Sequence, residues 1–341
     1  MQHFVIVGIL VIVMTVLTYL GIDAVGLAKQ MHPVAASAQA LSIDQLWNWE
    51  IIVISFLFSL IVVPLLYSLI VFRQKKGDTT DAEHMEGNTT LEIGWTVVPL
   101  IIVVVFAYLG AYSLGEVRRV DPEAFVVNVR AQQFVWVFEY PEYGIISDEL
   151  HLPVNKQVVL RMESADVIHS FWVPEWRVKQ DVVPGRVTEY RITPTMIGND
   201  FKVRCAELCG TNHAYMENLI VVSSQSDYDA WIAEQAAIAA AAAETPEGQG
   251  KILYTKYGCV GCHSVDGSPN TGPTWLGLFG KEEEMTDGTI IVADEAYITE
   301  SIREPNAKIV MGFASPSAMP SYSYLTDEEI ASIIAYMQTL K

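Results

Sequence analysis

The sequence predicts a multi-domain membrane protein in which N-terminal transmembrane helices precede an all-β domain and a C-terminal all-α domain. Three observations support this fold class. Long runs near the N-terminus carry no charged side chain, residues 120–225 hold short segments rich in Val, Phe and Trp, and an alanine-rich stretch then leads to a region with helical periodicity. A chain of 341 residues is long enough for two or three domains.

The composition agrees with a protein divided between membrane and water. Hydrophobic residues make up 51% of the chain and charged residues 18%, and the net charge is -19 with a mean hydropathy of +0.28. A soluble domain with this acidic surplus would not reach a positive mean hydropathy, so the apolar residues are concentrated in a membrane part. The surplus excludes nucleic acid as a partner, because few basic side chains are present to neutralise phosphates. It allows either a basic protein partner or no docking role.

Three runs of residues close to the N-terminus contain no charged side chain: Phe4–Ile22, Ile51–Phe72 and Ile93–Gly115. Each has about the 20 residues with which a helix crosses the hydrocarbon core. The second and third runs predict a transmembrane helical hairpin over residues 45–119. Arg73-Gln74-Lys75-Lys76 lies between them, and the positive-inside rule places this basic loop in the cytoplasm and everything after residue 116 outside.

The first run, within residues 1–44, has two interpretations. It lacks a basic segment before it and is long for the apolar part of a signal peptide, which favours a retained extra helix. The stretch Ala36-Ser37-Ala38-Gln39-Ala40 would suit a signal peptidase, which favours a cleaved signal. Both interpretations leave the predicted topology of the hairpin unchanged.

Residues 120–225 predict short β-strands separated by Pro, Gly, Asn and Asp. The expected strands are 125–130, 133–140, 157–162, 187–192, 201–204 and 218–222. Several short strands at this spacing are typical of a β-sandwich or a barrel.

The remaining residues predict a linker and a helical domain. The alanine run at 236–243 indicates a helical spacer over 226–246, with a flexible linker as the alternative. Residues 247–341 form the last domain, in which Thr326-Asp327-Glu328-Glu329 is a capping box. One face of the closing helix is then expected to carry Ile330, Ile333, Ile334, Met337 and Leu340.

A cluster of metal-binding side chains lies between the last two expected strands. It consists of Cys205, Cys209, His213 and Met216, with His169 upstream. Thiolate, imidazole and thioether are ligands of copper. Two thiolates this close can bridge two copper ions, each completed by one histidine, and Met216 and the backbone carbonyl of Glu207 would be weak axial ligands. Such a site has no open position for substrate and therefore favours electron transfer.

Other interpretations of the cysteines remain. A single blue-copper site needs one Cys, two His and a Met, so the second Cys favours two metals. Zinc would not require Met216. The pairs Cys205/Cys209 and Cys259/Cys262 could instead be two disulfides in an oxidising compartment.

Two membrane helices followed by an external β-domain, with Asp-Val-Ile-His-Ser-Phe-Trp around His169 and the Cys205–Met216 stretch, resemble subunit II of haem–copper respiratory oxidases. The resemblance covers roughly residues 45–225. It implies a cupredoxin fold and a binuclear CuA centre whose ligands are His169, Cys205, Glu207 through its carbonyl, Cys209, His213 and Met216. In that family the side chain that matches Glu207 also reaches a magnesium ion at the interface with subunit I.

Three further positions follow from the resemblance. Glu92 matches a glutamate implicated in passing protons to subunit I, and its alternative role is an ordinary carboxylate at a helix N-terminus. The segment Gln133–Tyr140 matches the region where electrons arrive from soluble cytochrome c. The family's tryptophan at that point is Phe134 here, while Trp136 is retained, so the usual docking route is in doubt.

A second motif offers a replacement for that route. Cys259-Val260-Gly261-Cys262-His263 is the C-x-x-C-H of covalent haem attachment, in which His263 ligates the iron. Together with Gly272-Pro273 and Met319-Pro320 it resembles the cytochrome c fold over residues 247–341, as in caa-type oxidases. The resemblance implies that the Pro273 carbonyl orients His263 and that Met319 is the second axial ligand, with Met311 as the alternative. A Met/His pair raises the haem potential.

These features predict the electron-input subunit of a cytochrome c oxidase, carrying two copper ions, one haem c and a possible shared magnesium. Electrons would pass from an external cytochrome or small copper protein to haem c, then to CuA and to subunit I. The chain would lie in a bacterial cell membrane as a multi-pass protein, with both cofactor domains on the outer side. The alternatives are a subunit of a nitric oxide reductase and a membrane-tethered electron carrier. No catalytic residue for oxygen chemistry is expected in this chain.

Overall fold

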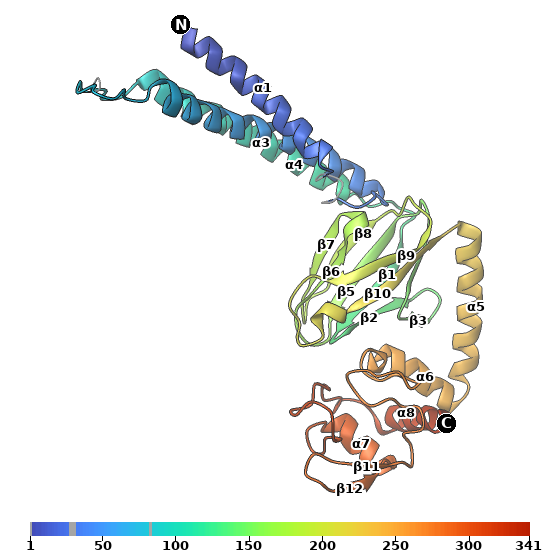
Figure 1. The fold of residues 1–341 in the computed structure, drawn as a ribbon. Coiled ribbons are helices and arrows are strands. Elements are labelled where there is room, and N and C mark those ends of the chain that lie inside the picture. Colours follow the sequence, from blue (N-terminus) through green and yellow to red (C-terminus); the bar gives the residue numbers. More distant parts are fainter. Residues whose placement is uncertain (1, 27–31, 82–83) are drawn as a thin grey trace. The chain divides into compact units, whose positions relative to one another are not determined.

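The computed structural model describes residues 2–26, 32–81 and 84–341, and the chain divides into two compact units (Figure 1). The first unit comprises residues 1–120 together with 174–177. The second comprises residues 121–173 and 178–341, so the β-domain and the C-terminal domain belong to one unit.

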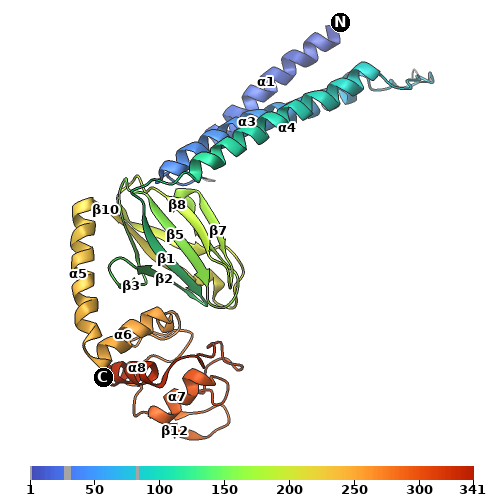
Figure 2. The same cartoon turned by 180° about the vertical axis from the view of Figure 1, so that it is seen from behind.

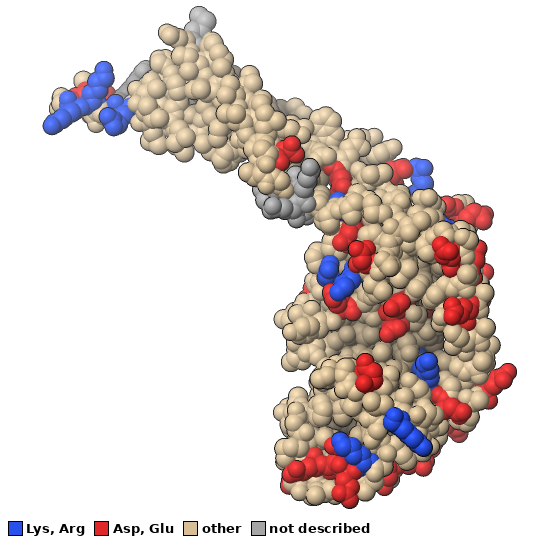
Figure 3. All heavy atoms as spheres, turned by 45° about the vertical axis from the view of Figure 1, so that its right-hand side comes forward, with Lys and Arg blue, Asp and Glu red and all other residues tan. Residues whose placement is uncertain are grey.

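Among the residues that the structure describes, the first unit has three helices long and apolar enough to cross a membrane: α1 (Gln2–Ala24), α3 (Ala38–Val71) and α4 (Thr89–Val117). On the face shown in Figure 3, charged side chains are sparse along these helices. Ser37 and Asn88 begin α3 and α4 by accepting hydrogen bonds from the amides of Ala40 and Leu91. The structure has both helices of the predicted hairpin, and the first of them begins at Ala38, before the expected boundary at residue 45.

The first apolar run is helical and has a defined partner. His3 Nδ1 lies 2.7 Å from the Tyr67 hydroxyl on α3, and the His3 ring also packs against Phe72. These contacts place α1 beside α3, and the retained helix and the cleaved signal both stay predictions.

A short helical turn, η1 (Pro174–Trp176), is anchored to α3 within the first unit. Arg177 follows it with a φ of 58°, which is unfavourable for a side-chain-bearing residue. Its guanidinium makes a bidentate pair with Asp44, at 2.8 and 2.9 Å, and also donates to the Pro33 carbonyl. This charge-assisted pairing offsets the backbone strain and ties residues 174–177 to the start of α3.

The β-domain is a sandwich of two five-stranded sheets. Its strands are β1 (Phe125–Gln132), β2 (Val135–Tyr140), β3 (Ile145–Ser147), β4 (Leu150–Pro153), β5 (Val158–Ser164), β6 (His169–Val173), β7 (Val178–Val182), β8 (Thr188–Ile192), β9 (Gly198–Cys205) and β10 (Glu217–Ser223). One sheet has the order β3-β2-β1-β5-β8 and the other β4-β10-β9-β6-β7, and Figure 2 shows them from behind. Trp136 of the first sheet meets Phe171 of the second edge-on, and both are fully buried.

The sequence predicted six of these strands and missed β3, β4, β6 and β7. The missed strands have three to five residues each, too few for a clear alternation. In β6 the polar residues His169 and Ser170 are buried together with the apolar Phe171 and Val173, so polarity and burial do not alternate along the strand.

The alanine-rich stretch forms the helix α5 (Gln225–Ala243), as the helical interpretation predicted. Ser224 caps its start by accepting from the Asp227 amide. Trp231 of α5 stacks on His151 of β4, with ring centroids 4.1 Å apart and planes within 8°. The spacer is therefore an ordered helix held on the β-sandwich rather than a flexible linker.

The C-terminal domain is built from the helices α6 (Pro246–Lys256), α7 (Glu295–Arg303) and α8 (Asp327–Thr339). A turn η3 (Cys259–Gly261) and a small hairpin of β11 (Glu282–Glu284) and β12 (Ile290–Val292) complete it, and the hairpin was not predicted. Thr326 and Glu329 form the predicted capping box. Gly250 lets α6 approach α8, since a Cβ there would collide with the Ser332 carbonyl.

Candidate copper and haem sites

The cysteine loop is positioned by the two strands on either side of it. Cys205 is the last residue of β9, and Met216 directly precedes β10. The Cys205 amide donates to the Met216 carbonyl at 3.0 Å and closes the loop at its base. His169 begins β6, which pairs with β9 through Phe171 and Cys205. The sandwich therefore brings together ligands that are far apart in the sequence.

The structure gathers all six residues expected to hold copper. The Sγ atoms of Cys205 and Cys209 are 3.8 Å apart. His169 Nδ1 lies 3.8 Å from Cys205 Sγ, and the Glu207 carbonyl oxygen lies 3.1 Å from the same sulfur. His213 Nδ1 and Met216 Sδ lie 3.6 and 3.8 Å from Cys209 Sγ. Each sulfur thus has one imidazole, and the two weak ligands lie beside different cysteines.

This arrangement fits two soft metal ions. The ligand atoms of His169, Cys205 and Cys209 lie within 4.8 Å of one another and are buried, as ligands of a shared centre must be. Burial opposes ionisation of Cys205, but hydrogen bonds from His169 and from the backbone of Glu207 outweigh it and lower its pKa to about 6. Burial and the neighbouring Cys205 raise the pKa of Cys209 to about 12. Bound cations would be needed to hold both sulfurs as thiolates.

Asp166 is a further candidate site residue, which the sequence did not indicate. Its Oδ1 accepts a hydrogen bond from His169 Nε2 at 2.8 Å, which fixes the tautomer that leaves Nδ1 facing the cysteines. Burial disfavours its charge, yet hydrogen bonds from His169 and from the amides of Gln133 and Val167 keep the pKa of Asp166 below its usual value. The sequence feature that could have indicated Asp166 is its position three residues before His169, a candidate ligand.

The aromatic pair expected on the electron path lies beside the copper ligands. Trp136 is fully buried and meets His169 edge-on at a centroid distance of 6.2 Å. Phe134 is 8% exposed and packs against Gly210 of the cysteine loop, where a Cβ would come 3.0 Å from the Phe134 ring. Gln133, which the sequence analysis left without a role, donates from Nε2 to the Cys209 carbonyl at 2.5 Å.

Exposed apolar side chains lie within two residues of the candidate copper ligands along the chain. We call Val167, Ile168, Leu208 and Tyr215 the apolar rim. Leu208 and Tyr215, which lie between ligand residues, are 78% and 80% exposed. Large exposed apolar groups gathered at one end of a domain indicate contact with another protein.

The haem-attachment motif lies in and after the turn η3. His263 Nδ1–H donates to the Pro273 carbonyl at 2.7 Å, which leaves Nε2 free to bind iron. Burial lowers the pKa of His263 and favours the neutral imidazole that a metal requires. Gly272 permits this contact, because a Cβ there would lie 2.6 Å from His263 Cε1.

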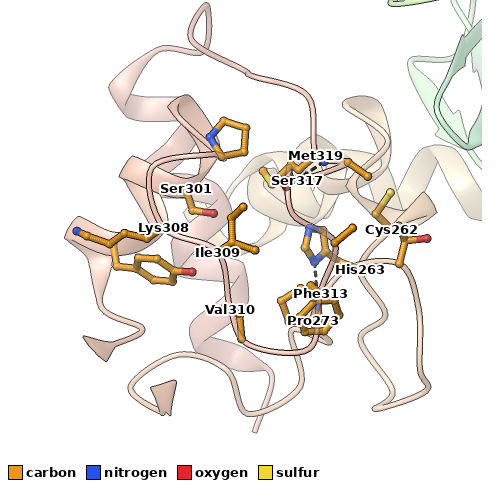
Figure 4. A pocket seen from close by; sticks show the side chains of 16 residues that line it. Cys262, His263, Pro273, Ser301, Lys308, Ile309, Val310, Phe313, Ser317 and Met319 are labelled. Carbon is orange, nitrogen blue, oxygen red and sulfur yellow. Dashed lines mark hydrogen bonds between the residues drawn. The ribbon is translucent and has the colours of Figure 1, made fainter. Parts of the chain in front are cut away.

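A pocket beside His263 distinguishes between the two methionines that are candidates for the second axial ligand. Figure 4 shows Met319 and His263 lining the same pocket, with Cys262 at its side. Met319 also packs against the core of the domain. Met311 is 49% exposed and does not line this pocket. The geometry fits a haem between His263 and Met319.

Glu92 lies in the first turn of α4, as expected. Its carboxylate accepts a hydrogen bond from the Asn88 amide at 3.3 Å, which is the helix-end role given as the alternative. A part in proton transfer remains a prediction.

Known proteins match all three parts of the chain. Residues 24–114 match the model of the cytochrome c oxidase subunit II transmembrane domain, and residues 144–224 that of its periplasmic domain. Residues 248–341 match cytochrome c. Cytochrome c oxidase subunit 2 of Alkalihalophilus pseudofirmus is 32% identical over 85% of this chain and 85% of its own length. The chain belongs to the cytochrome c oxidase subunit II family.

Two further subunit II relatives agree. The Bacillus sp. PS3 protein is 32% identical over 79% of this chain and 80% of its own length. The Synechocystis protein is 34% identical over 60% of this chain and 76% of its own length. The predicted fold class of transmembrane helices, cupredoxin-like domain and cytochrome c domain is confirmed. The prediction of an oxidase subunit II with a fused cytochrome c domain is also confirmed. The matching domains agree with the predicted binding of copper and haem and with an extracellular part.

Proposed function

We propose that this chain relays electrons within a terminal oxidase from an external donor to haem c, then to a binuclear copper centre, and on to the oxygen-reducing subunit I. The observation that carries the proposal is the pair of thiol sulfurs 3.8 Å apart, each beside one imidazole. The haem-attachment motif lies in the same compact unit. This chain supplies electron transfer and no oxygen chemistry.

The proposed copper centre takes six protein ligands: His169, Cys205, the Glu207 carbonyl, Cys209, His213 and Met216. When bound, the copper pair supplies a shared one-electron site. The chain's own contribution is rigidity, because Cys205 and Met216 are joined through the backbone and Asp166 fixes His169. Little then has to rearrange when the charge changes.

The proposed haem c is attached through Cys259 and Cys262, with His263 and Met319 as axial ligands. Burial raises the pKa of the Cys259 thiol to about 12.

We propose that the apolar rim docks on subunit I. The Glu207 side chain is exposed beside this rim, where it could share a magnesium ion with that subunit. The donor is proposed to be a basic cytochrome or small copper protein, because acidic side chains outnumber basic ones in residues 247–341. We keep Glu92 as a proposed participant in proton uptake, in addition to its contact with Asn88.

Co-purification with the neighbouring catalytic subunit tests the proposal. We expect two copper atoms and one iron atom per copy of this chain, outside those of subunit I, and turnover of oxygen. Nitric oxide turnover without oxygen turnover would instead make the complex a nitric oxide reductase. A stable chain that purifies without a large membrane partner would be a tethered carrier.

Electron paramagnetic resonance tests the copper assignment separately. The oxidised protein should give the signal of one unpaired electron shared equally by two coppers. Cys209→Ser should abolish that signal, because a single thiolate cannot bridge the pair symmetrically. A single-copper hyperfine pattern in the wild type would contradict the binuclear centre.

A further inference from the structure

The turn between β1 and β2 contacts both candidate cofactor sites. The turn consists of Gln133 and Phe134 and follows Gln132, the last residue of β1. The side chains of the two glutamines point to different partners. Gln132 reaches the C-terminal domain, whereas Gln133 reaches the cysteine loop of the β-domain. Both domains belong to the same compact unit.

Gln132 makes a buried polar contact with the C-terminal domain. Its side chain is 3% exposed, and Nε2 donates to the Tyr257 carbonyl at 2.5 Å. The Tyr322 hydroxyl donates to the same carbonyl at 3.0 Å and lies 3.3 Å from Gln132 Nε2. Tyr257 stands two residues before Cys259, the first haem-attachment cysteine. Gln132 therefore binds the backbone that carries the motif.

Gly258 provides the space for this contact. Its φ is 68°, which favours glycine, and a Cβ on it would collide with the amide group of Gln132. Gly261 makes a second close approach, where a Cβ would come 2.9 Å from Cβ of Val135. Arg130 adds a third contact, with its guanidinium 5.9 Å from the centre of the Tyr257 ring. Two glycines of the haem-attachment segment thus fit against β1, β2 and the turn between them.

Gln133 extends the connection to the copper ligands. Its Nε2 donates to the Cys209 carbonyl, and its amide donates to Asp166 Oδ2 at 2.7 Å. Asp166 in turn holds His169. The carbonyl of Gln133 lies 4.0 Å from Cys262 Sγ. One residue therefore contacts a copper ligand through its side chain and a haem-attachment cysteine through its backbone.

We propose that Gln132 and Gln133 are positioning residues that hold the haem-attachment motif against the copper loop and so set the rate of electron transfer between the two sites. Electron tunnelling slows steeply as the separation of two centres grows. The transfer rate therefore depends on a contact that keeps the two cofactor sites at a short, fixed separation. The inference rests on the proposed relay from haem c to copper. It adds the residues that keep the fused donor docked.

Loss of the contact should not release the domain, because α5 tethers it. The tether keeps the local concentration high, and the domain would alternate between docked and undocked positions. Gln132→Ala removes the buried side-chain amide that donates to the Tyr257 carbonyl and contacts the Tyr322 hydroxyl. Hydrogen bonds of this kind correspond to roughly a tenfold change in the docked-to-undocked ratio.

The test uses the intact complex and a cationic ruthenium photoreductant, which the acidic C-terminal domain attracts. After a flash, the absorption of haem c and of the copper centre gives the rate of transfer between them. We expect Gln132→Ala to slow this step, with about tenfold as the upper limit set by the change in the docked-to-undocked ratio, and with the static haem and copper spectra unchanged. Gln180→Ala, which removes a surface glutamine on β7, is the matched control and should transfer at the wild-type rate.

A double-mutant cycle with Gly258→Ala separates positioning from general damage. In the wild-type background the added methyl group should slow transfer, because it displaces Gln132. In the Gln132→Ala background the clash is absent and only the backbone strain at the φ of 68° opposes the methyl group, so Gly258→Ala should slow transfer by a clearly smaller factor. Equal effects of Gly258→Ala in both backgrounds would contradict the direct contact.

Hydrogen exchange gives a readout that does not depend on electron transfer. The amides of residues 257–259 should exchange faster in Gln132→Ala than in Gln180→Ala. Wild-type exchange together with a wild-type transfer rate in Gln132→Ala would overturn the inference. A wild-type complex that passes no electrons from haem c to copper would overturn the proposed relay instead, and the exchange comparison would still decide whether Gln132 docks the domain.

Discussion

At the scale of single residues, the sites depend on groups that bind no cofactor themselves. Asp166 is the clearest case, since it fixes His169 and also holds the backbone of Gln133. The sequence predicted the direct ligands because thiols, imidazoles and a thioether rarely gather at such short spacing unless they bind a metal. It did not predict Asp166, because an aspartate near a histidine is also common in proteins that bind no metal.

Asp166→Asn should weaken copper binding while leaving the fold intact. The substitution removes the charge that orients His169, and loss of such a supporting hydrogen bond typically lowers metal affinity about 10- to 100-fold. Competition with a copper chelator measures the effect. Asp200→Asn, at an exposed position on β9, is the control. Wild-type affinity in Asp166→Asn would show that His169 needs no support.

The two methionines of the C-terminal domain give a second prediction. Met319→His should lower the haem reduction potential, because replacing the thioether with a second imidazole favours ferric iron, within the roughly 0.8 V range that axial ligands span. Met311→Leu should leave the potential unchanged, since Met311 is largely exposed. A redox titration measures both. The reverse pattern would make Met311 the ligand.

At the scale of elements, helices with strong hydrophobic periodicity could be predicted from the sequence, whereas short strands with polar residues could not. The apolar runs, the alanine helix α5 and the capped helix α8 all follow from local sequence. The strand β6 does not, because two of its four buried residues, His169 and Ser170, are polar and the strand lacks a clear alternation. Such a strand is stabilised by its neighbours and by what it binds.

The docking of α5 gives a prediction at this scale. Trp231 stacks on His151 and meets Tyr140 edge-on at 5.2 Å, while Tyr228 is 4% exposed. Trp231→Ala should lower the free energy of local opening of α5 by about 2 kcal/mol, since a half-buried Trp contributes less than one in a core. Hydrogen exchange along residues 225–243 measures it.

Glu234→Ala, on an exposed position of the same helix, serves as the control for Trp231→Ala. The substitution should leave exchange close to the wild type. Equal acceleration in both variants would mean that α5 is held by its ends rather than by its aromatic face.

At the scale of the whole molecule, the order of domains was readable from the sequence, and the contacts between the two cofactor domains were not. Gln132 and Tyr257 are 125 positions apart, and neither carries a motif. Only the folded sandwich and the helix α5 bring them together. The same holds for the apolar rim, whose residues are separated by strands but surround one site.

Association with subunit I depends on the apolar rim in this account. Leu208→Glu places a charge on a 78% exposed apolar residue, and burying it at an interface would be unfavourable. We expect loss of co-purification with subunit I, with the copper spectrum retained. Leu276→Glu, which charges an exposed leucine of the C-terminal domain, should not affect the association. Equal recovery of subunit I with both variants would exclude the rim as the docking surface.

In the proposed relay, electrons reach copper through the haem of the same chain. Flash photoreduction of the oxidised wild-type complex tests it most directly. We predict that haem c is reduced first and that its reoxidation matches reduction of the copper centre one to one, at a rate independent of protein concentration. Copper reduction without prior haem reduction, or haem that stays reduced while copper remains oxidised, would contradict the relay.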